Sequence, residues 1–341
     1  MGVPLTPIIP RKVLTLEHFR GKWFAVDANN VLYQFLALIR TPDGKPLTSP
    51  TGEITSHLVG LAFRATKLIC DYEMRLVFVF DGKPHGLKAR ELMKRKEVRE
   101  KAYKEWVEAL KRGDYDAAFS KAVVTGVLTR KMVEDAKKLL DLLGIPWIQA
   151  PSDAEAQAAY MVSRGDVWAV NSRDYDSLLY GTPRLVRYLT ISGTEFLPSK
   201  GIVRRLQPEL IELNNVLSTL NITREQLIDV AILVGTDFNE GVKGIGPKTA
   251  LRLIRIYKRI EKLPASIRDK VAPYYQEVRE IFLNPPVTTE YTLDYKRVDE
   301  EGLIRFLCDE KGFSPKRVET LISRMKRVHI KGAIYSMDEW I

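Results

Sequence analysis

Acidic residues stand where short apolar runs of this chain end. Such runs are typical of buried strands in a parallel sheet, and ligands bind beyond the carboxyl ends of these strands. The acids that follow the runs 24–26, 77–80, 167–170 and 232–234 are Asp27, Asp81, Asp174, Asp176 and Asp237. Taken singly, each is explained as a turn residue or as a helix N-cap. Because the placement repeats, we expect these carboxylates to converge on one crevice.

Two further acids lie in the segment Pro151-Ser-Asp-Ala-Glu-Ala156. Ser152 and Glu155 have the spacing of a capping box, so the segment predicts the start of a helix. Asp153 and Glu155 also suit the positive end of a helix dipole. Residues two apart point to different sides of a helix, so both reach one metal ion only if the ion lies over the helix end.

A crevice built from acids alone indicates a particular chemistry. Seven close carboxylates repel one another and raise each other's pKa values, and hard divalent cations offset this repulsion. The four histidines and two cysteines show no zinc spacing. We therefore expect two Mg²⁺ ions, with Mn²⁺ as a substitute. Such ions activate water and stabilise the in-line transition state at a phosphodiester.

Hydrophobic periodicity predicts the elements that hold these acids. The apolar runs alternate with helical patterns over 58–72, 131–143 and 153–163. This alternation predicts an α/β fold whose mostly parallel, twisted central sheet is flanked by helices on both sides. Residues 87–112 differ, because their thin apolar stripe lies among dense charge. A helix of this kind is poorly buried, so we expect it to project from the body.

The composition and charge of the chain indicate which class of partner it binds. The chain has 341 residues, of which 45% are hydrophobic and 28% charged, as in a soluble globular protein. Its longest uncharged stretch, 28–39, is too short to span a membrane, and two distant cysteines make no disulfide framework. The net charge is +10, and residues 83–138 hold 16 Lys or Arg against 9 Asp or Glu. Basic segments at 243–262 and 311–331 add to this, and together they favour an extended polyanion.

Residues 241–249 form a glycine-rich segment before a basic helical pattern. It is not a P-loop, because Pro247 separates the last glycine from the lysine. It is not a dinucleotide fingerprint either, because Thr249 stands where a third glycine is needed. The backbone N–H groups of such a hairpin, at a helix start, suit a phosphate. The alternative is a plain turn between two helices.

Together these motifs resemble those of the flap endonucleases, most closely the archaeal ones, of the structure-specific 5′ nuclease superfamily. The segments that carry the resemblance, in order from residue 1 to about 331, are Phe24-Ala-Val-Asp27-Ala, Tyr33-Gln-Phe-Leu36, Val79-Phe-Asp81-Gly-Lys-Pro84, Ala150-Pro-Ser-Asp-Ala-Glu155-Ala, Asp174-Tyr-Asp176-Ser-Leu178, Val234-Gly-Thr-Asp237 and Gly244-Ile-Gly-Pro-Lys248. The resemblance implies one 5′-nuclease domain over 1–332, with a helical arch at about 83–130 and a helix–hairpin–helix DNA-binding segment at about 226–262.

The resemblance also implies roles for individual residues. The residues implied to serve one metal ion are Asp81, Asp153 and Glu155, with Asp27 nearby, and those implied to serve a second are Asp174, Asp176 and Asp237. Lys88 and Arg95 match the catalytic basic residues that engage the scissile phosphate at the base of the arch. Tyr33 matches the aromatic residue that stacks on the nucleobase next to the cut. The other implied DNA-binding residues are Gly2 at the buried N-terminus and Gly244, Gly246 and Lys248, which grip duplex backbone through a potassium ion.

The chain departs from the family pattern at three places. Asn29 and Asn30 follow Asp27 where small or apolar residues are more usual. The family usually has Glu where this chain has Asp153, a side chain shorter by one methylene. In the tail, 333–341, Ile334 stands at the usual Gln position of a sliding-clamp motif. The residues expected to bind the clamp are Met337, Trp340 and Ile341. A frayed terminus is the alternative for this tail.

The sequence thus predicts a metal-dependent nuclease that cuts branched DNA at the base of a 5′ flap and also acts as a 5′ exonuclease, in replication and repair. We expect a monomer without membrane contact in the interior of an archaeal cell, associated with the nucleoid. The alternatives are another superfamily member (an exonuclease or a junction resolvase), a phosphatase of the Asp-x-Asp type, and a non-catalytic DNA-binding scaffold.

Overall fold

The computed structural model describes residues 2–41, 44–112, 126–191, 193–197 and 202–338. A seven-stranded sheet lies at its centre, in the order β1-β9-β6-β5-β2-β3-β4. The strands from β6 to β4 run parallel, and β9 and β1 extend one edge in antiparallel pairing. The strands are β1 (Lys12–Val13), β2 (Trp23–Asp27), β3 (Arg75–Phe80), β4 (Trp147–Gln149), β5 (Ala169–Asn171), β6 (Arg184–Arg187) and β9 (Glu209–Glu212). The predicted mostly parallel sheet is confirmed.

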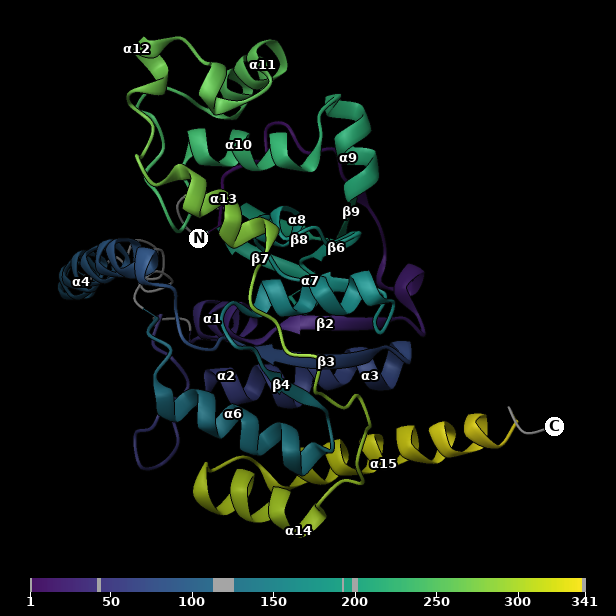
Figure 1. Cartoon of the computed structure of the whole chain (residues 1–341). Coiled ribbons are helices and arrows are strands. Elements are labelled where there is room, and N and C mark those ends of the chain that lie inside the picture. The colour runs from purple at the N-terminus through teal and green to yellow at the C-terminus, as the bar shows by residue number, and fades with distance from the viewer. Residues whose placement is uncertain (1, 42–43, 113–125, 192, 198–201, 339–341) are drawn as a thin grey trace.

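Helices cover both faces of the sheet (Figure 1). In β2 the side chains alternate, so that Phe24 and Val26 pack into one core and Ala25 into the other. The helices on the face of Phe24 include α1 (Ala28–Leu38), α2 (Ser56–Val59), α3 (Thr66–Tyr72) and α6 (Arg130–Leu143). Those on the face of Ala25 include α7 (Ala154–Arg164), α8 (Asp176–Leu179), α9 (Leu213–Leu220), α10 (Arg224–Val234), α11 (Pro247–Tyr257) and α13 (Tyr275–Leu283).

The predicted helices begin and end close to their expected limits. The pattern over 58–72 corresponds to α2 and α3, which a π-helical stretch, Gly60–Ala65, joins into one rod. Helix α6 begins at the Thr129 N-cap and ends at Gly144, whose φ of +70° is the left-handed conformation that glycine adopts most readily. Short helices complete the chain at Leu16–Phe19, Gly86–Lys88, Ile260–Lys262 and α12 (Ala265–Arg268), and strands β7 (Gly193–Leu197) and β8 (Ile202–Leu206) form a separate hairpin.

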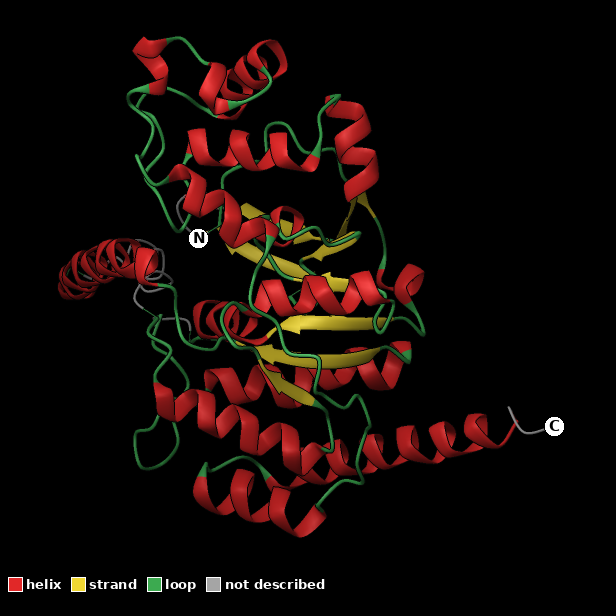
Figure 2. Ribbon diagram, viewed as in Figure 1, coloured by secondary structure: helices red, strands yellow, loops and turns green. Residues whose placement is uncertain are grey.

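Helix α4 (Ala89–Lys111) projects from the body, as its thin apolar stripe predicted (Figures 1 and 2). Three of its large apolar side chains are exposed, namely Met93, Val98 and Tyr103. The rest of the expected arch, from 113 to 125, lies outside the described residues. The chain re-enters the body at the start of α6.

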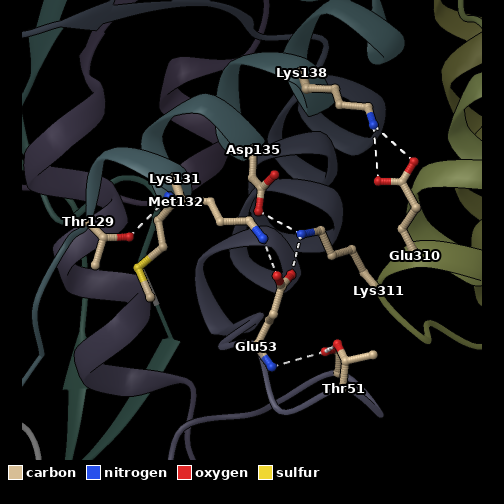
Figure 3. Close-up of polar contacts among 10 residues, drawn as sticks. Thr51, Glu53, Thr129, Lys131, Met132, Asp135, Lys138, Glu310 and Lys311 are labelled. Carbon is tan, nitrogen blue, oxygen red and sulfur yellow. Dashed lines mark hydrogen bonds and ion pairs between the residues drawn. The ribbon is translucent and has the colours of Figure 1, made fainter.

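The C-terminal segments pack against the side of the sheet that carries α3 and α6. They comprise α14 (Glu300–Leu303), the π-helical turn Ile304–Glu310 and α15 (Pro315–Asp338). Lys311, nearly buried, bridges Glu53 and Asp135 at 2.7 Å each, and Lys131 pairs with the same Glu53 (Figure 3). Residues 333–338 of the expected tail continue α15, and 339–341 lie outside the description.

None of the helices in the described ranges is both long and apolar enough to cross a membrane.

Candidate metal centre and active site

Asp27 and Asp81 lie at one edge of the sheet because β2 and β3 are parallel neighbours. The register pairs Asp27 with Val79, so both strands end together. Asp27 is the N-cap of α1, and its Oδ1 accepts a hydrogen bond from the Asn30 backbone N–H at 3.0 Å. Its other oxygen accepts one from Ser172 Oγ at 3.3 Å, just after β5. Three segments distant in sequence therefore meet at the predicted edge.

The start of α7 lies against Asp81. The Ala154 N–H donates to Asp81 Oδ1 at 2.9 Å, and the Gly82 N–H donates to the Ser152 carbonyl at 2.6 Å. A Cβ on Gly82 would lie 2.1 Å from the carbonyl oxygen of Ala150. Glycine at this position therefore allows the two loops to approach closely enough to join Asp81 to the helix start.

The predicted capping box is wrong, and its absence leaves two acids available to the cleft. Asp153, not Ser152, is the N-cap, and among the described residues no side-chain hydrogen bond caps this end of α7. Glu155 instead accepts a hydrogen bond from Ser177 Oγ at 2.8 Å. Asp153 Oδ1 accepts one from Lys88 Nζ at 2.7 Å. Both carboxylates thus contact other segments of the chain instead of capping α7.

Asp174 and Asp176 follow β5 and contact segments from elsewhere in the chain. Asn30 Nδ2 donates to Asp174 Oδ2 at 2.9 Å, and the Val3 N–H donates to Asp176 Oδ1 at 3.0 Å. A Cβ on Gly2 would lie 2.7 Å from both the Asp174 Cβ and the Asp176 Oδ1. The N-terminal residues therefore pack directly on this half of the cleft, which leaves no room for a side chain at position 2.

Asp237 lies in the turn that follows α10 and is half-buried. Thr236 Oγ1 and Asn239 Oδ1 share a hydrogen bond of 2.7 Å, which fixes the turn on both sides of Asp237. After burial, the charge of Asp237 is the next cause that raises the pKa of Asp176. This electrostatic contact shows that the acid after α10 faces the same cleft as the acid after β5.

The acids of the cleft are costly to ionise together. Burial is the first cause that raises the pKa of Asp27, Glu155 and Asp176, and neighbouring carboxylates raise each of them further. The pKa of Asp176 reaches about 7. Desolvation also raises the pKa of Asp81, although this residue is more exposed. An added cation would relieve this repulsion.

Lys88 brings a positive charge to the cleft from the base of α4. Its Nζ lies 2.7 Å from Asp153 Oδ1 and 5.0 Å from the centre of the Phe238 ring. Burial lowers the pKa of Lys88, but the acids, Asp153 first, outweigh it, so the pKa is raised and the ammonium stays charged. Arg95 lies on α4, and its side chain is outside the described part of the structure.

The residues present fit divalent cations. Over the described ranges, no three or more His, Cys, Asp or Glu side chains are already arranged to hold an ion. Several carboxylate oxygens of the cleft accept hydrogen bonds from protein donors, as Glu155 does from Ser177. The donor set itself is oxygen-rich and carries raised pKa values, and Mg²⁺ and Mn²⁺ prefer such carboxylate ligands. A carboxylate oxygen has two lone pairs, so it can keep a protein donor while it binds an ion.

The glycine hairpin joins α10 to α11, and α11 lies on the far side of α10 from the sheet (Figure 1). Gly244 has a φ of +86°, so its conformation itself favours glycine. Gly246 has an ordinary φ of −93°, and a Cβ there would meet nothing within 4 Å. Internal packing therefore does not explain Gly246. Lys243 and Lys248 are exposed on either side.

Tyr33 is 40% exposed on α1, the same helix that begins at Asp27. Its ring is thus available to an external partner close to the cleft. The residues that orient the acids were not predicted: they are Asn30, Ser172, Ser177 and Tyr180. Their only signal in the sequence is that each lies within four residues of a predicted acid.

Family comparisons agree with this geometry. Residues 1–102 match the family model of the XPG N-terminal domain, and residues 144–237 match that of the XPG I-region. Flap endonuclease 1 of Staphylothermus marinus is 49% identical over 349 aligned residues, which cover 100% of this chain and 99% of the relative. Flap endonuclease 1 of Pyrococcus abyssi is 50% identical over 341 residues, which cover 100% and 98%.

Solved structures of nucleases have a similar fold. The flap endonuclease-1 from Methanococcus jannaschii matches with a TM-score of 0.76 and 40% identity, covering 97% of this chain and 100% of that chain. The catalytic core of Rad2 in complex with a DNA substrate matches with a TM-score of 0.70, and at 22% identity this likeness concerns the fold alone. With relatives about half identical over its whole length and both XPG regions present, this chain belongs to the flap endonuclease 1 family of the structure-specific 5′ nuclease superfamily.

Proposed function

We propose that this protein cleaves branched DNA at the base of a 5′ flap and also removes nucleotides as a 5′ exonuclease. The observation that carries the proposal is the convergence of acids from separate segments on one sheet edge, beside the root of the projecting basic helix α4. The acids are Asp27, Asp81, Glu155, Asp174, Asp176 and Asp237. The family supports a role in processing Okazaki fragments during replication and in repair.

We expect two Mg²⁺ ions, which Mn²⁺ can replace. The proposed ligands are Asp81, Asp153 and Glu155, with Asp27 nearby, for one ion, and Asp174, Asp176 and Asp237 for the other. When bound, the ions supply an activated water and stabilise charge at the phosphodiester. The chain's own contribution is to hold the acids in place: Ser172 bonds Asp27, and Asn30 joins Asp27 to Asp174.

The basic residues at the root of α4 act on the substrate phosphate. Lys88 is charged and paired with Asp153, so an arriving phosphate competes for the same ammonium and receives its N–H hydrogen bonds. Arg95 lies on α4, seven residues after Lys88, and is proposed to engage the same phosphate. The exposed ring of Tyr33 offers a stacking surface for the nucleobase next to the cut.

Duplex DNA binds at the glycine hairpin in this proposal. No neighbouring atom of the described structure excludes a side chain at position 246. The close approach of a DNA backbone would exclude one, because only glycine lets two backbones come so near. The N–H groups at the start of α11, the exposed Lys248 and a potassium ion at Gly244–Lys248 together favour phosphate. The contact is independent of base sequence, because it involves backbone alone.

The remaining partners are proposed on sequence grounds. Met337, Trp340 and Ile341 form the clamp-binding peptide, although Ile334 replaces the usual Gln and the last two residues lie outside the described structure. We expect a monomer that works at the archaeal nucleoid. Co-elution with the sliding clamp, compared between the full chain and a chain ending at residue 332, tests the tail.

Cleavage of an end-labelled flap substrate with Mg²⁺ tests the assigned site. Asp81→Asn and Asp237→Asn should each abolish turnover, because each removes a charge that the ions need. Glu17→Gln is the matched control, since Glu17 pairs with Arg20 before β2, at the opposite end of that strand from Asp27. Unchanged cleavage activity in both cleft variants would contradict the proposed active site.

A substrate panel separates the alternatives. We expect the double-stranded substrate with a 5′ flap to be cut faster than a nick, a gap, a bubble or a four-way junction. Preference for the junction would indicate a resolvase, and preference for the nick an exonuclease. Hydrolysis of a small phosphate ester without DNA cleavage would indicate a phosphatase.

A further inference from the structure

Tyr180 connects the two halves of the acidic cleft. Its hydroxyl donates to Asp153 Oδ2 at 2.5 Å, while Lys88 holds Oδ1 at 2.7 Å. Tyr180 is the C-cap of α8, the short helix that begins at Asp176. A residue from the segment of the second proposed ion site therefore binds a carboxylate of the first.

The Tyr180 ring is held before any ion binds. It packs against Phe282 with ring centres 5.0 Å apart, and Phe282 packs against Phe238 at 5.4 Å. The Tyr180 backbone N–H donates to the Asp176 carbonyl at 3.0 Å. The residue is 8% exposed. Its hydroxyl therefore has a fixed position, and this position determines where the Asp153 carboxylate can accept the hydrogen bond.

A tyrosine hydroxyl donates and a carboxylate oxygen accepts, so the 2.5 Å contact is a hydrogen bond from Tyr180 to Asp153 Oδ2. A short, buried hydrogen bond between a hydroxyl and a carboxylate is among the stronger ones that a protein makes. Tyr180 therefore holds Asp153 Oδ2 by a strong hydrogen bond.

We propose that Tyr180 is a positioning residue that fixes the short Asp153 side chain, so that Oδ1 alone serves Lys88 and the first metal site. This inference rests on the proposed metal centre. The side chain of Asp153 ends one methylene earlier than a glutamate, and the hydrogen bond to Tyr180 fits that length. A glutamate at 153 would carry its carboxylate about 1.5 Å farther and lose this fit. The identities of residues 153 and 180 are therefore coupled.

Tyr180→Phe tests the proposal, because phenylalanine preserves the ring packing and removes the hydroxyl. We measure Mn²⁺ binding to the full chain without DNA, from the signal of unbound Mn²⁺ in electron paramagnetic resonance. The dissociation constant of at least one ion should rise about tenfold, the usual effect of removing a partner of a metal ligand. Single-turnover cleavage should slow at low Mg²⁺ and recover in part at high Mg²⁺, with DNA affinity unchanged.

Tyr291→Phe is the matched control. The Tyr291 hydroxyl also donates to a carboxylate, Asp166, at 2.5 Å, but just beyond the opposite end of α7. It should leave Mn²⁺ binding unchanged. Mn²⁺ binding equal to wild type in Tyr180→Phe would overturn the positioning role. If Asp81→Asn also bound Mn²⁺ like wild type, the metal centre itself would be wrong, which separates the two failures.

A second pair of variants tests the coupling between residues 153 and 180 directly. Asp153→Glu alone should weaken Mn²⁺ binding, because the longer acid conflicts with the hydroxyl. Adding Tyr180→Phe to Asp153→Glu should restore part of the affinity, since the conflict is removed. Independent effects of the two substitutions, adding in the double variant, would contradict the coupling.

Discussion

Replacing Asp176 by asparagine should stabilise the metal-free protein while abolishing cleavage. Asp176 is 6% exposed, and its pKa rises from 3.8 to about 7, first through burial and then through Asp237 and Asp174. At about 1.4 kcal/mol for each pH unit, this difference corresponds to about 4 kcal/mol of stability lost on ionisation. Because neighbouring acids ionise more easily when Asp176 is neutral, we expect a gain of about 1–3 kcal/mol from the variant.

The stability gained by Asp176→Asn should depend on pH. A carboxyl with a raised pKa in the folded state contributes stability that is fully present below 3.8 and is lost as pH rises through about 7. Asparagine imitates the protonated acid, and its Oδ1 can keep the hydrogen bond from the Val3 N–H. The advantage of Asp176→Asn should therefore grow between about pH 4 and pH 7 and then level off.

The assay is guanidinium unfolding followed by circular dichroism, with a chelator present, at several pH values. Adding Mg²⁺ at pH 8 should stabilise the wild type more than the variant, because the ion binds only the folded state and needs the charge. A variant less stable than wild type at pH 8 without metal would refute the reasoning. So would a gain of the same size at every pH.

Three further substitutions test other parts of the structure. Lys88→Ala should slow single-turnover cleavage about 100-fold with a much smaller loss of DNA affinity, because it removes a donor to the reacting phosphate. Gly82→Ala should cost about 1–3 kcal/mol in urea unfolding and reduce cleavage, because its Cβ meets the Ala150 carbonyl oxygen at 2.1 Å and displaces Asp81. Lys311→Met should cost about 3 kcal/mol, since it leaves Asp135 and Glu53 without their shared cation (Figure 3).

Each of these has a matched control. Lys22→Ala removes a lysine that lies over the Trp168 ring, away from the cleft, and should leave cleavage intact. Gly86→Ala adds a Cβ with nothing within 4 Å and should leave stability unchanged. Lys138→Met breaks the exposed pair with Glu310 and should cost under about 1 kcal/mol. Equal effects in a test variant and its control would contradict the corresponding explanation.

The positions of the acids could be predicted because they depend on buried strands. The runs before Asp27 and Asp81 are apolar on both faces, which is what a central parallel strand requires, and parallel neighbours end at one edge. The same logic located the segment of Asp174, since β5 pairs with β2. This part of the fold follows from burial alone.

The orientation of each acid could not be predicted in the same way. Ser152 and Glu155 have capping-box spacing, but tertiary donors such as Ser177 take the carboxylate instead. The Tyr180 hydroxyl reaches Asp153 from another helix, and no local pattern encodes that contact. Strands β4 and β6 were also missed, because Gln149, Arg184 and Arg187 leave neither with a continuous apolar run. Strand β5 is equally short, but it follows the apolar run 167–170.

The glycine hairpin could be predicted only in part. The sequence predicted a hairpin here, but it did not predict the positive φ of Gly244 or the open space around Gly246. The structure thereby strengthens the expectation of an external partner there. Arg95 and Trp340 stay predictions, because their side chains lie outside the described residues.

The most direct test of the central claim is anomalous X-ray diffraction from crystals of the full chain grown with Mn²⁺. We expect two Mn²⁺ peaks in the acidic cleft, one bordered by Asp81 and Glu155 and the other by Asp174 and Asp176. Mn²⁺ peaks confined to other parts of the surface, with none at these four carboxylates, would contradict it.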